Sequence, residues 1–462
     1  MDDANFVTQS ISGVINTMFY TKKFERASGL AINWSKTKGM FCNNLGVIDV
    51  NRHLPEITWS ENISCLKINY GQVDFVKEGW GSRIKHFMEE IRFFNSTAFT
   101  LKAKSVLSKS KLFSALAYTG AVHEIPLMDR RKVDRALLGF LVPFLSNTKN
   151  TDADVCSKLR TFAAPEFLGG YKVDFISLHL DLLRLKTVMK YLKCLVYNLE
   201  LPSCLYFMEY NLGLQLCSLF NLHCNSRTPH AFSPNQHHGS VLQLIRHHRI
   251  SLVELTEGCV NSIYKRIICE MNQTMHNFKY YRLVPKYLPS YLSSFNYKLH
   301  FEFLPLKCMF KEWQLDNDSC CMFCEVGYET TFHLFGGCEK LKGLWTILRK
   351  THALLTGEDF NYEYQRNNLK LDLVSVQCNG RFEKTLVYLN TITNYSIWRH
   401  RNDIRYKFVN FDLEAITKKM MRSIGARRGV EPNMSDSYKI PHIDKLFEAL
   451  RSAVNHYPFD NG

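Results

Sequence analysis

The sequence predicts a mainly α-helical protein with a few short strands near its N-terminus. Apolar residues recur at steps of three and four over several long stretches, which is the spacing of one face of an α-helix. A short strand-and-helix pattern is confined to residues 1–50. The chain has 462 residues, of which 46% are hydrophobic and 22% are charged, so it has enough apolar surface for two to four folded domains.

Four helices are predicted within residues 1–144. The first carries Val14, Met18 and Phe24 on one face, and Ser28-Gly29 favours a turn at its end. The other three have apolar stripes that contain Ile84, Phe87, Met88 and Ile91, then Val106, Leu107, Leu112 and Leu116, then Val133, Leu137 and Phe140. Packed together, these three helices would bury their stripes against one another.

The rest of the chain continues the helical pattern. After Pro165 and Gly169-Gly170, a long helix is predicted from its stripe of Leu178, Leu182, Leu185, Met189, Leu192 and Val196. Further helices are expected at Trp345–Leu354 and at 380–408. Residues 425–440 are rich in Gly, Pro, Asn and Ser and are predicted to form a loop.

Three cysteines and one histidine stand close together in the last third of the chain. The array reads Cys321-x2-Cys324-x8-His333-x4-Cys338. Thiolates and an imidazole suit tetrahedral zinc, and four protein ligands leave no open position for a catalytic water, so we predict a structural zinc knuckle. Two alternatives stay open. Cys320 is able to replace Cys321, although C-x2-C is the more usual spacing, or the cysteines form a reduced cluster without metal.

The chain is basic, with 58 Lys and Arg against 43 Asp and Glu and a net charge of +15. This excess favours a polyanionic partner, so RNA or DNA, or both, is expected to bind. Between Arg83 and Arg135 there are eleven basic and five acidic residues. Phosphate contacts are predicted from Lys102, Lys104, Lys109, Lys111, Arg130, Arg131 and Lys132. A second basic stretch, 399–428, is equally well explained as a solvated helical face.

Cysteine usage and hydropathy indicate where the protein is found. Its fifteen cysteines are scattered and odd in number, and no signal peptide precedes them, so reduced thiols are expected. No apolar run reaches the roughly 18 residues that cross a bilayer. The expectation is therefore an intracellular protein, nuclear or cytoplasmic, without a membrane partner.

The acidic pair Asp2-Asp3 gains meaning from two motifs that come after it in the chain. These are Ser28-Gly29-Leu30-Ala-Ile32-Asn33 and then Lys36-Thr37. Their order and spacing resemble non-LTR (LINE-like) retrotransposon reverse transcriptases, in which an aromatic-x-Asp-Asp turn precedes the same two motifs. The resemblance implies that Asp2 and Asp3 match the metal-binding acids of the polymerase palm. They would hold Mg²⁺ only if a full palm is present.

Motifs further along resemble the same family. They are Leu101-Lys102-Ala-Lys104 with Tyr118, Gly169-Gly170, Leu304-Pro305, Glu329-Thr330, His333-Leu334-Phe335 and Ile397-Trp398-Arg-His-Arg401-Asn402. The resemblance implies a palm end at 1–50, a thumb-like helical region at 51–145 and a helical connection at 146–300. It further implies a zinc-binding knuckle at 301–350 and a basic helical C-terminal region at 351–462.

The resulting functional hypothesis is a truncated reverse transcriptase that retains zinc and nucleic-acid binding. In this family the third palm carboxylate, the fingers and the nucleotide pocket precede the acid pair. This chain alone is therefore predicted not to extend a primer. Two alternatives stay open. One is a host-employed module that binds nucleic acid or protein; the other is a piece of a full-length active polymerase whose start was mis-assigned.

Overall fold

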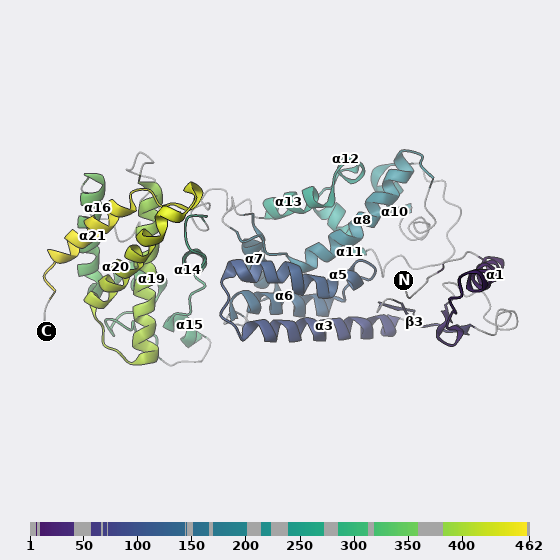
Figure 1. Ribbon diagram of the computed structural model, residues 1–462, viewed down its shortest axis with the longest axis horizontal. Coiled ribbons are helices and arrows are strands. Elements are labelled where there is room, and N and C mark those ends of the chain that lie inside the picture. The colour runs from purple at the N-terminus through teal and green to yellow at the C-terminus, as the bar shows by residue number, and fades with distance from the viewer. Residues whose placement is uncertain are drawn as a thin grey trace.

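The computed structural model describes residues 6, 10–40, 57–65, 68–71, 73–143, 145, 151–165, 170–200, 214–222, 239–271, 285–312, 318–358 and 382–459. Over these residues the protein is mainly α-helical with a few short strands, which confirms the predicted fold class at that level. Figure 1 shows two helical lobes side by side, with helix α1 beyond the first of them. Across the described ranges, no helix is long and apolar enough to span a membrane.

The N-terminal segment holds one α-helix, one 3₁₀ turn (Trp34–Lys36) and four short strands among its described residues. Helix α1 (Ile11–Ser28) starts at Ser10, whose side chain accepts from the N–H of Gly13, and ends at Gly29 with φ 72°, as the predicted turn requires. Strand β1 (Lys38–Gly39) pairs in parallel with β2 (Thr58–Trp59), and β3 (Ile63–Cys65) pairs antiparallel with β4 (Ile68–Tyr70). The predicted acids Asp2 and Asp3 lie outside the described residues.

The first lobe packs around one long central helix, α8. Its elements are α3 (Val73–Asn95), α4 (Leu101–Leu107), a π-helical turn (Ser108–Phe113), α5 (Ser114–Gly120), α6 (Leu127–Leu141), α7 (Asp152–Ala163), α8 (Ile176–Val196), α10 (Leu214–Phe220), α11 (Gly239–His247), α12 (Leu252–Thr256) and α13 (Val260–Met271). Helix α8 contacts α5, α6, α11, α12 and α13. Most of the predicted stripe residues meet in one core, where Phe87, Leu112, Leu137 and Leu185 are fully buried, whereas Val106 is 60% exposed.

A buried charge network holds α8 to its neighbours. Arg184 is fully buried and donates to the carboxylate of Asp181 and to the backbone carbonyl of His123 at 3.1 Å. Asp181 also accepts from Arg130 at 2.7 Å and from Ser240 at 3.0 Å. Because each buried charge has an opposite charge and further hydrogen bonds, the network fixes how these helices pack.

The second lobe contains the cysteine-rich knuckle. Its helices are α14 (Ser290–His300), α15 (Lys307–Glu312), α16 (Lys342–Thr356), α19 (Glu383–Lys407), α20 (Leu413–Val430) and α21 (Ile443–Asn455). Helix α14 joins the lobes, because Tyr297 lies in the first core whereas Leu292 and Phe295 lie in the second. Across the junction, the N–H of Leu101 donates to Ser294 Oγ at 3.0 Å.

The predicted loop at 425–440 is wrong in its first part, since α20 continues to Val430. Tertiary contacts outweigh the local glycine content. Arg427 is buried and donates to Glu431 at 2.8 Å and to the carbonyl of Tyr287 at 3.1 Å. Short 3₁₀ turns come after it at Glu431–Asn433 and Asp436–Tyr438. The helices predicted around residues 178–196, 345–354 and 380–408 are confirmed by α8, α16 and α19.

Candidate metal centre and basic surface

The four predicted ligands meet at one point. One ligand atom from each of Cys321, Cys324, His333 and Cys338 lies within 4.8 Å of all the others. The Sγ atoms of Cys321 and Cys338 are 3.9 Å apart, and Cys324 Sγ is 3.3 Å from His333 Nε2. In a tetrahedral site with Zn–S bonds of about 2.3 Å, two sulfurs stand about 3.8 Å apart. The cluster can therefore hold one four-coordinate metal ion.

A tight hairpin turn sets the first two ligands. The N–H of Cys321 donates to the carbonyl of Gly327 at 2.7 Å, and the N–H of Glu325 donates to the carbonyl of Cys321 at 2.9 Å. The N–H of Phe323 points at Cys321 Sγ at 3.4 Å, which favours the thiolate. Cys320 pairs with Tyr328 in an isolated β-bridge and is not among the clustered residues. Neighbouring residues of an extended segment face opposite sides, so only Cys321 faces the cluster.

A short π-helical turn, His333–Gly337, carries the imidazole. Its first N–H, that of His333, donates to Thr330 Oγ1 at 3.1 Å. The next two side chains, Leu334 and Phe335, are fully buried in the core of the second lobe. The turn is therefore fixed from both sides: by a hydroxyl at its start and by apolar packing behind it.

Gly327 lies directly against the His333 ring. A Cβ at this position would stand 2.5 Å from Cε1 of the imidazole, closer than real Cβ atoms come. Gly327→Ala should displace His333 and weaken metal affinity by about 10- to 100-fold, the usual effect of losing a group that orients a ligand. Competition with a chromogenic chelator measures this affinity. Gly337→Ala is the control, since its Cβ would meet Phe332 only at ordinary contact distance, 3.5 Å. Equal affinities for both variants would contradict the prediction.

A hydrogen bond joins Cys321 and Cys338, whose Sγ atoms are 3.9 Å apart. A hydrogen bond from Cys338, together with backbone N–H groups and nearby His333, lowers the pKa of Cys321 to about 5 despite its burial. The same hydrogen bond raises the pKa of Cys338, with burial adding to the rise. Metal binding needs the cysteine sulfurs as thiolates, so a divalent ion would displace the thiol protons.

A buried ion pair fastens the knuckle to helix α19. Glu329 and Arg401 are both fully buried, and two nitrogens of the guanidinium donate to the two carboxylate oxygens. Glu329 also accepts from the backbone N–H of Lys307 at 2.8 Å and of Met322 at 3.2 Å. The sequence identified both charged residues as motif members but predicted no contact between them.

The structure separates the predicted phosphate-binding residues into two groups. Lys102, Lys109 and Lys111 are at least partly exposed and form no ion pair within the described part of the chain. Lys104 is only 7% exposed, and its ammonium donates to the carbonyl of Phe140. Burial, with Lys298 nearby, lowers the pKa of Lys104 to about 8. Lys104 therefore faces the core rather than a ligand, and it is not part of the proposed binding surface.

The predicted Arg130-Arg131-Lys132 cluster is engaged with acidic partners. Arg130 belongs to the buried network through Asp181. Arg131 pairs with Asp152 at 3.0 Å, and Lys132 pairs with Asp129 at 3.0 Å. Arg131 and Lys132 stay exposed and each contacts an acidic side chain, although Asp152 is shared with Arg135 at 2.9 Å. We define the basic surface as Lys102, Lys109 and Lys111.

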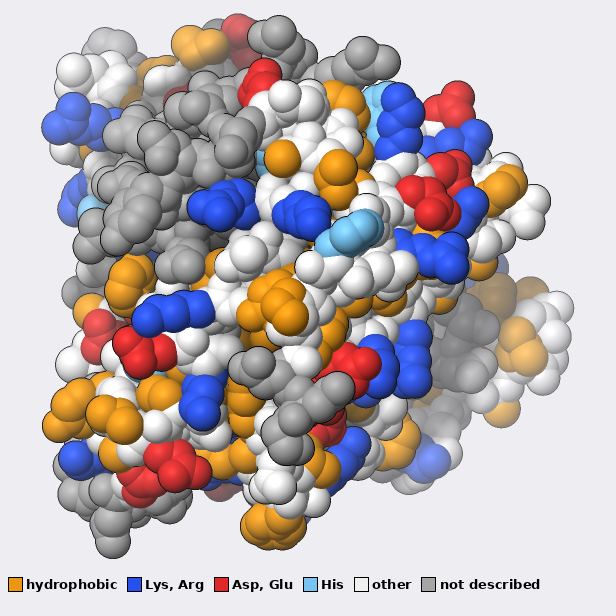
Figure 2. Space-filling model, turned by 90° about the vertical axis from the view of Figure 1, so that its left-hand side faces the viewer, with side chains coloured by type: hydrophobic (Ala, Val, Ile, Leu, Met, Phe, Trp, Pro, Cys, Tyr) orange, Lys and Arg blue, Asp and Glu red, His pale blue; other side chains and the backbone are white. Residues whose placement is uncertain are grey.

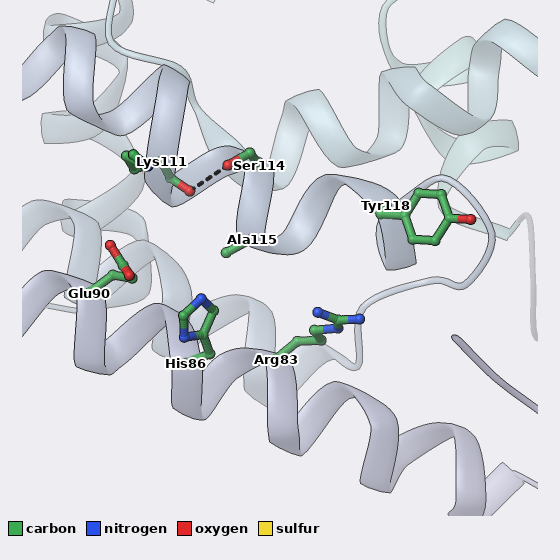
Figure 3. A pocket seen from close by; sticks show the side chains of 7 residues that line it. All are labelled: Arg83, His86, Glu90, Lys111, Ser114, Ala115 and Tyr118. Atoms are coloured by element: carbon green, nitrogen blue, oxygen red, sulfur yellow. Dashed lines mark hydrogen bonds between the residues drawn. The ribbon is translucent and has the colours of Figure 1, made fainter. Parts of the chain in front are cut away.

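Of these three lysines, Lys111 lines a half-open groove of about 390 Å³. Figure 3 shows Arg83, His86 and Glu90 on α3, facing Ser114, Ala115 and Tyr118 of α5 across the groove. Lys111 lines it from the π-helical turn, where its carbonyl accepts from Ser114 Oγ at 2.8 Å. The sequence predicted Lys111 from the local excess of basic residues and Tyr118 from a motif, but only the packing of α3 on α5 brings Arg83 and His86 opposite them.

The basic stretch of the second lobe is largely paired. Lys418 contacts Glu414 at 3.0 Å, Lys419 contacts Asp403 at 2.6 Å, and Arg428 contacts Asp444 at 2.6 Å. At the end of this lobe, Figure 2 shows Lys and Arg side chains scattered among acidic and apolar ones. This agrees with a solvated helical face for these pairs.

The comparisons with known proteins add nothing to the geometry. No protein-family model matches the chain, and no curated protein and no solved structure matches it significantly. A function is therefore inferred from the residues and their arrangement.

Proposed function

We propose that this protein is a zinc-stabilised nucleic-acid-binding chain of the non-LTR retrotransposon reverse-transcriptase lineage. One observation carries the proposal. The Cys321–Cys338 array is held through Glu329 and Arg401 to α19, and these two residues come from the two motifs, Glu329-Thr330 and Ile397-Trp398-Arg-His-Arg401-Asn402, that resemble this family. Motifs separated by many residues in sequence are thus parts of one physical unit. That is expected if the whole unit was inherited together.

Zinc is the metal we propose for the cluster. Three sulfurs and one imidazole nitrogen match its preferred donors, and four protein ligands complete a tetrahedron. Such a site is closed to substrate, so the ion would act by folding the hairpin and the His333 turn onto the second lobe. The buried Glu329–Arg401 pair would then hold the ordered knuckle against α19, and Leu334 would hold it in the core of the second lobe.

Nucleic acid is the partner we propose for the basic surface. A net charge of +15 favours a polyanion, and Lys102, Lys109 and Lys111 are exposed cations, the last of which lines a groove together with Arg83, His86 and Glu90. Long flexible ammonium groups suit phosphates, which carry the charge of every sequence alike. Binding is therefore expected to depend strongly on salt and little on base sequence.

Charge reversal tests this surface. The triple variant Lys102→Glu, Lys109→Glu and Lys111→Glu should weaken binding to a duplex at least tenfold on any sequence. The slope of the logarithm of the binding constant against the logarithm of salt concentration should also become less negative. The change should be about 0.9 for each phosphate that the variant no longer neutralises. Fluorescence anisotropy across a salt series measures both quantities.

Lys104→Met is the matched control. It removes a lysine from the same helix as Lys102, but one whose ammonium faces the core, so duplex affinity and salt slope should match the parent protein. If Lys104→Met weakens binding as much as the triple variant, or if the parent's salt slope is flat, the basic surface is not the binding site.

A further inference from the structure

The second lobe carries a row of aromatic rings and cations that none of the proposed roles uses. Lys311 Nζ lies 5.8 Å from the ring centre of Tyr328, on the knuckle hairpin. The guanidinium of Arg405 lies 4.3 Å from the Phe310 ring and 5.8 Å from the Tyr406 ring. Because Phe310 and Lys311 are adjacent on α15, the row runs from the hairpin across α15 to the end of α19. With Phe408, we call these six residues the aromatic row.

The outer rings of this row face solvent. Tyr328 is 67% exposed, Tyr406 is 62% exposed and Phe408 is 89% exposed. Packing of the knuckle does not need them, since its apolar anchors, Leu334 and Phe335, point into the core. Large exposed rings gathered with cations are typical of a binding surface rather than of a free protein surface.

Phe408 is unusual in a second way. It comes directly after α19 with φ 54° and ψ 35°, in the left-handed region that favours glycine or asparagine. A bulky side chain is disfavoured there, and at 89% exposure the ring gains little packing in return. Stability alone therefore gives no reason for phenylalanine at this position, whereas contact with a ligand does.

We propose that the aromatic row binds single-stranded RNA or DNA. Unpaired bases would stack on Tyr328, Tyr406 and Phe408, while the exposed Lys311 would meet a phosphate between them. A duplex is a poor ligand, because its base faces are already stacked on one another and cannot reach the rings. The cations favour a polyanion over an apolar protein partner. This surface lies apart from the basic surface of the first lobe and acts by stacking rather than by charge alone.

The test uses the full chain purified with zinc and three labelled probes: a short oligouridylate, an oligothymidylate of equal length and a duplex. Tyr328→Ala with Tyr406→Ala should weaken binding of both single strands about tenfold or more, since loss of one stacked base has an effect of this size. Duplex binding should not change. Tyr328→Phe with Tyr406→Phe keeps both rings and should retain the parent affinity.

Phe408→Gly separates function from folding. It should raise the melting temperature, because glycine adopts the left-handed backbone conformation without strain, and yet weaken single-strand binding.

Tyr438→Ala is the control. It removes another exposed tyrosine of the same lobe, outside the row, and should leave the binding of every probe unchanged. If the tyrosine-to-alanine double variant and Phe408→Gly both bind single strands as the parent does, the proposal is overturned. The aromatic row would then serve another class of partner, such as a protein. Equal losses on the duplex would overturn it as well. The lysine variants of the first lobe report on the duplex, so the two proposals fail independently.

Discussion

Cys324→Ser should abolish metal binding and loosen the knuckle. The parent protein should contain about one equivalent of zinc, measured by elemental analysis, and the variant should contain none. Three ligands cannot fill the tetrahedron, and structural zinc contributes an apparent free energy of about 10–16 kcal/mol to folding in small knuckle-like peptides, on the order of the whole stability of a domain. Amide hydrogen exchange should accelerate over residues 318–341, where the hairpin and the His333 turn lie.

Cys320→Ser is the matched control for this prediction. It removes the cysteine next to a ligand, but Cys320 is outside the cluster and pairs through its backbone with Tyr328. The control should bind zinc as the parent does. If Cys320→Ser loses zinc while Cys324→Ser keeps it, or if the parent contains none, the closed four-ligand site is refuted.

Glu329→Gln should destabilise the second lobe by about 3–5 kcal/mol, because it leaves the guanidinium of Arg401 buried without a counter-charge. Arg401→Met should cause a loss of similar size, since Glu329 then stays charged beside only two backbone N–H groups. The double variant should lose less than the sum of the two single variants. Denaturant unfolding of the zinc-bound protein gives all three values.

The exposed pair Lys418–Glu414 provides the comparison. Both side chains are about half exposed, so Lys418→Met should change the free energy of unfolding by less than about 1 kcal/mol. Additive losses in the Glu329 and Arg401 variants would show that the two side chains act separately. The knuckle would then be fixed to α19 by apolar packing alone.

These contacts explain how a small knuckle can affect a large lobe. The position of the hairpin depends on the metal cluster, the buried ion pair and the Leu334–Phe335 anchor. Its own Phe323 is also buried, with the ring centre 6.1 Å from that of His400 on α19. The exposed side of the same hairpin carries Tyr328, at one end of the aromatic row. A metal that orders the hairpin would therefore also order that end of the row.

Helices were predictable from the sequence wherever the apolar stripe was long. The stripe around Leu178–Val196 corresponds to α8, and the glycine after Ser28 ends α1 in the left-handed conformation that only glycine adopts easily. The loop predicted at 425–440 fails for a tertiary reason. Arg427 and Glu431 form a buried pair that continues α20 past Gly425 and Gly429, and no local propensity reveals that pair.

The sequence by itself predicted which four residues cluster, because Cys321, Cys324, His333 and Cys338 are separated by short spacings that local turns can close. It could not decide which lysines face solvent. Lys102 and Lys104 are two residues apart on a helix, so they point to nearly opposite sides, and the packing of α4 against α6 buries Lys104. The Glu329–Arg401 pair, the groove between α3 and α5, and the aromatic row likewise join residues from separate elements. Spacing and periodicity specify local geometry, whereas burial and charge pairing depend on neighbours that only the folded chain brings together.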